Sequence, residues 1–288
     1  MVARRRAGFT LVEAMVALTI SSILVVLVST VFLAQNRYYA LQISRSAAHD
    51  NARVMTEVMA GELRSVARGG FVVARDTLLE VRSPMTVAAV CAQPATSRVA
   101  VQYSGGEGFL DTDEFGGFAV QDTLTDAWSY YDITGWNNVW NAIDQNGKQG
   151  AKDCAANGAD TVGAVDEFQR LRRLDTYAGS LPAVGQLVML YRRVEYVITT
   201  SKMDSTSLGL FRGIFGADPV EVATGLDASA RFQYRAGGST YVSPVTGSGL
   251  GDIDAVRIVA DARTRPRAGA TDDVTFGWSV NVYLRNGR

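Results

Sequence analysis

The sequence predicts an α+β fold, in which one long N-terminal helix packs on an antiparallel β-sheet domain. Two observations carry this prediction. No proline precedes Pro84, so nothing in the N-terminal segment forces a helix to break. From residue 71 onwards, apolar residues recur at every second position, which is the period of a strand with one buried face. Strands of this one-sided kind are typical of antiparallel sheets.

The predicted helix begins with a basic leader and an apolar run of membrane length. Three arginines at residues 4–6 precede Gly8, and no charged residue occurs from Ala14 to Ala34. A helix needs about 20 apolar residues to cross the hydrocarbon core of a bilayer. Basic residues beside a membrane span favour the cytoplasmic side. We therefore expect a leader at 1–8, a transmembrane half at 9–34 and the rest of the chain outside the cytoplasm.

Beyond residue 34 the helical pattern becomes amphipathic. Charged residues, Glu62 among them, fall largely off the apolar face. Arg68-Gly69-Gly70 is a helix stop signal, so we expect one helix from about Phe9 to Val66, whose segment 35–68 is covered by the following domain. The apolar face consists of Tyr38, Leu41, Ala48, Ala52, Met55, Met59, Leu63 and Val66.

Residues 71–288 are expected to form one β-rich extracytoplasmic domain. Residues 71–73 and 77–82 predict a hairpin, and 85–91 and 98–104 predict two further strands. Residues 105–181 are rich in Gly, Asp, Asn and Trp and lack a clean period. We expect an irregular excursion there, with a short helix at 165–174 and with aromatic residues gathered in a local mini-core.

Glu13 is the one charged residue within the apolar run. A carboxylate in a membrane helix is costly and usually has a partner. If the chain is cut after Gly8, the new amino group of Phe9 lies four residues before Glu13 and on the same helix face. The same ammonium can equally pair with the Glu13 of a neighbouring subunit.

The run Gly8-Phe9-Thr10-Leu11-Val12-Glu13 resembles the type IV prepilin motif of pilins, minor pilins and type II secretion pseudopilins. The resemblance implies that a prepilin peptidase cuts between Gly8 and Phe9 and methylates Phe9, and that Glu13 helps to dock the subunit into a helical filament. A secretory signal fits less well, because its apolar region spans about 7–15 residues. A plain single-pass anchor explains the length of the run but not Gly8 or Glu13.

Six segments of the C-terminal half carry a second resemblance: 193–198, 210–212, 221–222, 230–234, 254–259 and 280–286. They are similar to PilW-type minor pilins and also to J-type pseudopilins of type II secretion. The helix lacks the mid-membrane proline common in major pilins, which favours a minor subunit. The resemblance implies an inner-membrane precursor that joins other major and minor pilins through an assembly platform, reaches the pilus or cell surface, and promotes pilus assembly for adhesion, twitching motility or DNA uptake. A J-type subunit at the tip of a secretion pseudopilus is the alternative.

The two cysteines, Cys91 and Cys154, both follow the membrane helix. In an oxidising exterior such a pair predicts a disulfide. In the chain-entropy model, a bond that closes a loop of about 60 residues stabilises the fold by roughly 4 kcal/mol. Two unrelated buried thiols are the alternative.

Nothing in the sequence points to an enzyme. His49 is the only histidine, and we expect a surface role for it, because general-base catalysis needs a positioned partner. The motifs of serine hydrolases, P-loop proteins and zinc proteases are absent. Asp111, Asp113 and Glu114 form the one candidate calcium site, but they lack the spaced glutamate and glycine of an EF-hand, so we expect a solvated turn and no cofactor. The net charge of −1 argues against a nucleic-acid partner.

Overall fold

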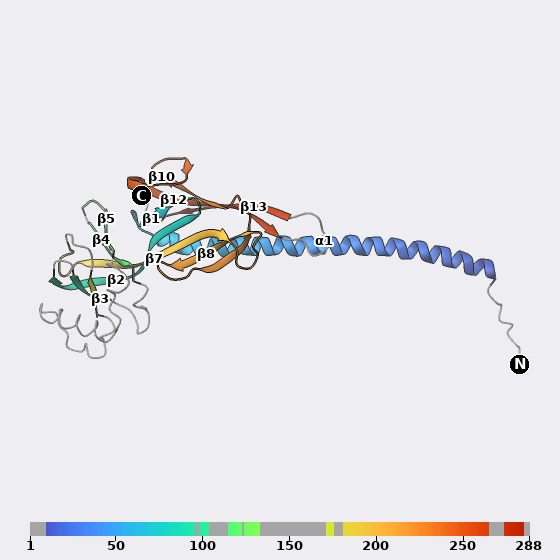
Figure 1. Cartoon of the computed structure of the whole chain (residues 1–288), viewed down its shortest axis with the longest axis horizontal. Helices are drawn as coiled ribbons and strands as arrows, with labels where there is room; N and C mark the ends of the chain where they lie inside the picture. The colour runs from blue at the N-terminus through green and yellow to red at the C-terminus, as the bar shows by residue number, and fades with distance from the viewer. Residues whose placement is uncertain are drawn as a thin grey trace, which may run out of the picture.

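The computed structural model describes residues 10–95, 98–103, 115–122, 124–132, 171–175, 181–264 and 274–284. One helix, α1 (Leu11–Ser65), projects far out of a β domain that surrounds its C-terminal end (Figure 1). Thr10 is the N-cap of the helix and Val66 its C-cap, so the helix ends where the sequence predicted. The expected α+β class, a long helix on an antiparallel sheet, is confirmed.

The described strands form a single thirteen-stranded sheet, and every pairing in it is antiparallel. The order along the sheet is β11-β10-β12-β9-β8-β7-β2-β3-β6; β1 pairs with β2, β13 with β12, and β4 with both β5 and β7. A 3-10 helix, η4 (Gly247–Asp252), precedes β12. The strands are β1 (Phe71–Ala74), β2 (Leu78–Ala95), β3 (Arg98–Tyr103), β4 (Gly117–Gln121), β5 (Trp128–Asp132), β6 (Leu171–Asp175), β7 (Leu187–Thr200), β8 (Leu208–Ile214), β9 (Val220–Leu226), β10 (Arg231–Ala236), β11 (Tyr241–Val242), β12 (Ile253–Thr264) and β13 (Val274–Tyr283).

Strand β2 differs from the prediction in its length. The hairpin of β1 and β2 is confirmed, but β2 continues through Pro84 to Ala95 as one strand where the sequence predicted two. Proline cannot donate a ladder hydrogen bond. The register of β2 with β7 shifts between Pro84 and Thr86, and a bulge of this kind lets a strand pass a proline without ending.

The excursion at 105–181 is more regular than predicted. It contributes β4, which pairs with β7, and β6, which pairs with β3. Strand β6 occupies the end of the segment 165–174, for which a helix was expected. Apolar Leu171 and Leu174 are three residues apart, as on a helix face, but pairing with the edge of β3 overrides this local preference. Residues 133–170 lie outside the described part of the chain.

The larger hydrophobic cluster joins the C-terminal end of α1 to the inner face of the sheet. Met55, Met59, Leu63 and Val66 are at most 1% exposed and pack against residues of most of the strands. Tyr38, at the start of the predicted apolar face, is 64% exposed. Among the helix side chains that are described, the domain therefore buries the end of the segment 35–68 rather than its beginning.

A smaller cluster lies at the end of the domain away from the projecting helix (Figure 1). Phe115, Phe118 and Val120 of the excursion pack there against residues of β2, β3 and β7. The rings of Phe118 and Tyr131 stack with centroids 4.8 Å apart and planes 12° from parallel. The excursion thus shares a second core with these strands of the sheet, and the expected mini-core of its own aromatic residues stays a prediction.

Candidate membrane-anchoring and assembly site

The first turn of α1 is closed by reciprocal hydrogen bonds between Thr10 and Glu13. The Glu13 N–H donates to Thr10 Oγ1 at 3.3 Å. The Thr10 N–H and the Thr10 hydroxyl both donate to Glu13 Oε2, each at 3.2 Å. This capping box satisfies backbone N–H groups that the start of a helix leaves without partners. A carboxylate at this end also interacts favourably with the helix dipole.

The capping role of Thr10 and Glu13 was missed in the sequence, although Thr-x-x-Glu before an apolar run is its signature. Gly8 and Phe9, the predicted processing residues, lie outside the described residues. Pairing of Glu13 with the amino group of Phe9 therefore stays a prediction. The Glu13 carboxylate lies in the first turn of the helix.

Within the described part of the chain, one segment, Leu11–Ile43, is long and apolar enough to cross a membrane. The domain leaves most of this segment exposed: the most apolar window is 0% buried, and Leu18 and Val28 are 71% and 67% exposed. Apolar surface costs about 25 cal/mol per Å² in water, so lipid or other helices must cover this segment. The helix runs unbroken past the predicted boundary at residue 34.

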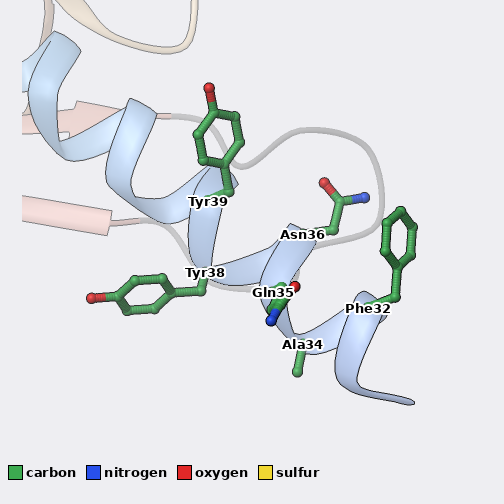
Figure 2. A pocket seen from close by; sticks show the side chains of 6 residues that line it. All are labelled: Phe32, Ala34, Gln35, Asn36, Tyr38 and Tyr39. Carbon is green, nitrogen blue, oxygen red and sulfur yellow. The ribbon is translucent and has the colours of Figure 1, made fainter. Parts of the chain in front are cut away.

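Aromatic side chains surround the outer end of the apolar segment. Figure 2 shows Phe32, Tyr38 and Tyr39 projecting from the helix in different directions around the polar side chains of Gln35 and Asn36. Tyr38 and Tyr39 are each 64% exposed. Tyrosine is enriched where a membrane helix passes from hydrocarbon into water. These residues fit that interface, close to the predicted boundary.

Four residues, which we call the Glu62 cluster, join α1 to the sheet: Glu62, Arg192 and Tyr196 of β7, and Arg212 of β8. Arg212 Nε donates to Glu62 Oε2 at 3.0 Å, and Arg192 Nη2 donates to Oε1, also at 3.0 Å. Arg212 Nη2 and the Tyr196 hydroxyl donate to the same carboxylate. The side chain of Glu62 is only 17% exposed.

The Glu62 cluster corrects the expectation that Glu62 lies off the buried face. Glu62 directly precedes Leu63 and follows Met59 by three residues, so it borders the buried stripe, and that position was the available signal. Burial acts to raise the pKa of Glu62, but the hydrogen bonds from Arg212 and Tyr196, with the charges of Arg212 and Arg192, outweigh it and hold the pKa below its ordinary value.

A second cluster, which we call the Arg82 cluster, joins the segment after α1 to the excursion. It consists of Arg82, Tyr130, Asp132 and Tyr191. Arg82 binds the Asp132 carboxylate through Nε at 3.1 Å and Nη2 at 2.9 Å, and the Tyr191 hydroxyl donates to Asp132 at 2.7 Å. The guanidinium lies 4.7 Å from the centre of the Tyr130 ring. The Tyr130 hydroxyl donates to the carbonyls of residues 67 and 68, so the excursion holds the C-terminal end of the helix.

The two clusters predict a loss of stability in acid. Burial acts to raise the pKa of Asp132, but hydrogen bonds from Arg82 and Tyr191 lower it on balance, as in Glu62. Each carboxylate stabilises the fold above its unfolded pKa, ordinarily 3.8 for Asp and 4.5 for Glu, and this contribution is lost as the pH falls through the folded pKa. Burial raises the pKa of Glu80, so protonation of Glu80 in acid has the opposite effect and favours the folded state. We expect the urea concentration at the unfolding midpoint of the full chain in detergent to fall between pH 5 and pH 3. In Glu62→Gln this midpoint should fall less steeply with pH. An unchanged slope in that variant would contradict the assignment.

The remaining predicted sites are placed in part. Cys91 lies on β2 and is disulfide-bonded. Its predicted partner, Cys154, lies outside the described residues, so the pairing itself stays a prediction. Asp111, Asp113 and Glu114 also lie outside them. The described residues hold no group of three or more His, Cys, Asp or Glu side chains able to bind a metal ion.

Comparison with known proteins identifies the N-terminal segment. Residues 3–29 match the family model of the prokaryotic N-terminal methylation motif. No curated protein and no solved structure matches the chain. The matched residues include Gly8, Phe9, Thr10 and Glu13 and continue into the exposed apolar helix. The motif and the apolar segment that follows it support a prepilin-like N-terminus, in which the chain is similar to pilins and pseudopilins.

Proposed function

We propose that this chain is a minor pilin of a type IV pilus, of the PilW type. It is made as a single-pass inner-membrane precursor with its N-terminus in the cytoplasm and residues 71–288 outside. Prepilin peptidase cuts between Gly8 and Phe9 and methylates Phe9. The observation that carries the proposal is the methylation motif at 3–29, which overlaps a 33-residue apolar segment, Leu11–Ile43, whose most apolar window is exposed.

In this proposal the protein acts through assembly and performs no catalysis, and it needs no cofactor. The apolar surface of Leu11–Ile43 passes from lipid into contact with the helices of major and minor pilins. The Glu13 carboxylate pairs with the methylated amino group of a neighbouring subunit or of its own Phe9. The assembly platform moves the subunit into the filament or its tip complex. Because the Glu62 cluster joins helix and sheet, the domain moves with the helix.

Two substitutions of Glu13 test this role. Glu13→Gln keeps an oxygen that can accept from the Thr10 N–H, so it retains the helix cap, but it removes the charge. We expect Glu13→Gln and Glu13→Ala to be cleaved normally, to stay in the membrane, and to fall at least about tenfold in filaments sheared from the cell surface. Pairing of a buried charge predicts this loss.

Glu57→Gln, a substitution at an exposed helix position, serves as the control and should leave the filament fraction unchanged. Equal amounts of wild-type and Glu13→Gln protein in filaments would contradict the assembly role. Loss of protein secretion with intact surface pili in a deletion strain would instead favour the J-type pseudopilin.

A further inference from the structure

Strand β13 forms a free edge of the described sheet. Among the described strands it pairs with β12 alone, over ten consecutive residue pairs. The Leu284 N–H donates to the Asp254 carbonyl at 3.0 Å, one position further along the same register. In an antiparallel ladder, residues bonded to the neighbouring strand alternate with residues whose N–H and C=O face the other side. The residues that face the free edge are therefore Thr275, Gly277, Ser279, Asn281 and Tyr283.

This edge lacks four of the features by which sheets discourage pairing with another chain. The four are short length, proline, charged side chains and bulges. Strand β13 has ten residues, no proline and no charge, and its register with β12 contains no shift. Other outer strands in the described sheet differ: β11 has two residues, and β6 carries Arg172 and Arg173.

The strand is held in place by its inner face. Val282 is 1% exposed, and Trp278 and Val280 pack against the larger hydrophobic cluster. Ser279 and Asn281, on the outer face, are exposed. The edge is therefore organised before any partner arrives, so binding needs to order only the incoming strand.

We propose that β13 is a strand-addition site, at which an extended strand of a different pilin-like subunit joins the sheet. The inference rests on the proposed function, because it takes the partner to be anchored in the same membrane. Strands β12 and β13 contact α1 and lie along it (Figure 1). A subunit whose membrane helix packs beside α1 brings its own domain next to this edge. Backbone hydrogen bonds supply the affinity, and the uncharged side chains of β13 select a partner strand without charges opposite them.

The β13 strand of a second copy of this chain does not fit the edge. Two identical strand edges form a closed pair only about a two-fold axis, which makes the strands antiparallel. Because β13 lies along α1, that axis would also point the two membrane helices in opposite directions. Helices anchored in one membrane from the same side run the same way. Pairing with a second β13 is thereby excluded, and the proposal places the partner strand on another subunit.

Photo-crosslinking in cells tests the proposal on the full chain. A photoreactive phenylalanine analogue replaces Tyr283, which is 55% exposed beside the edge, or Leu124, which is 93% exposed between β4 and β5. We expect an adduct from position 283 with another pilin-like subunit, mapped by mass spectrometry to an extended strand. We expect it to exceed any adduct from position 124 at least tenfold.

Three variants in the same background isolate the backbone of the edge. Ser279→Pro removes an N–H that faces the free edge and none that binds β12, so the adduct should fall at least tenfold. Ser279→Thr keeps that N–H and should retain the adduct. Ser279→Lys places a charge on the edge and keeps the backbone N–H of residue 279. It should reduce the adduct like Ser279→Pro, and it tests the edge even if the proline variant does not fold.

Each alternative outcome is distinct. No adduct at position 283, or an adduct that Ser279→Lys leaves unchanged, would overturn strand addition. An adduct with copies of this chain alone would overturn the assignment of the partner to another subunit. If strand addition is overturned but the processed chain is present in filaments sheared from those cells, the proposed function still stands. Absence of the chain from filaments would overturn the proposed function and this inference together.

Discussion

Replacement of Glu62 by alanine is expected to lower the free energy of unfolding of the domain by about 3–5 kcal/mol, the cost of removing one member of a buried ion cluster. The loss exceeds the value of the hydrogen bonds themselves, because Arg212 and Arg192 keep their charges beside a face that has lost its carboxylate. The Tyr196 hydroxyl loses its acceptor as well. Urea unfolding of the full chain in detergent, followed by tryptophan fluorescence, measures this loss.

Glu57→Ala is the matched control on the same helix. Glu57 pairs with Arg53 four residues earlier, and both side chains are more than 60% exposed, so we expect a change of about 0.5 kcal/mol or less. A double-mutant cycle of Glu62→Ala with Arg212→Met should show a large coupling energy. If Glu62→Ala costs no more than Glu57→Ala, the cluster does not join helix and sheet.

Replacement of Asp132 by alanine is expected to cost a similar amount, about 3–5 kcal/mol, because it removes the only carboxylate of the Arg82 cluster. The Arg82 side chain is 14% exposed and stays beneath Tyr130 and Tyr191. Its charge then has the carbonyl of residue 69 as a remaining hydrogen-bond acceptor, at 3.5 Å. The same urea titration measures the loss.

Asp252→Ala removes the partner of Arg68 in an exposed ion pair, in which the side chains are 57% and 54% exposed. We expect it to cost about 0–1 kcal/mol. Limited proteolysis shows where the chain is destabilised. Asp132→Ala should increase cleavage around β5, whereas Glu62→Ala should not increase cleavage there selectively. Equal costs for Asp252→Ala and Asp132→Ala would contradict the role of the Arg82 cluster.

The sequence predicted the elements whose signals are local. The helix, its end near Val66 and the strands of the C-terminal half follow from periodicity, because each buries one face against the same core. The box of Thr10 and Glu13 is equally local and was open to prediction. The expected boundary of the membrane span at residue 34 also lies beside the exposed Tyr38 and Tyr39.

What the sequence did not predict depends on contacts between distant segments. Glu62 meets Arg212 across 150 positions, and Arg82 meets Asp132 across 50. No periodicity encodes such pairs, and a charged residue on a helix is most often solvated. Strand β6 was expected as helix because its own residues have a helical spacing. Its pairing with β3 depends on the edge of a strand that is distant in the sequence.

The most direct test of the account is the intact mass of the protein from its native membrane, with and without Gly8→Ala. Prepilin processing predicts a wild-type mass that lacks residues 1–8 and carries one additional methyl group. It also predicts that Gly8→Ala retains the full-length, unmethylated mass. A full-length wild-type mass from cells with active prepilin peptidase would contradict the account, and α1 would then be a plain membrane anchor for the β domain.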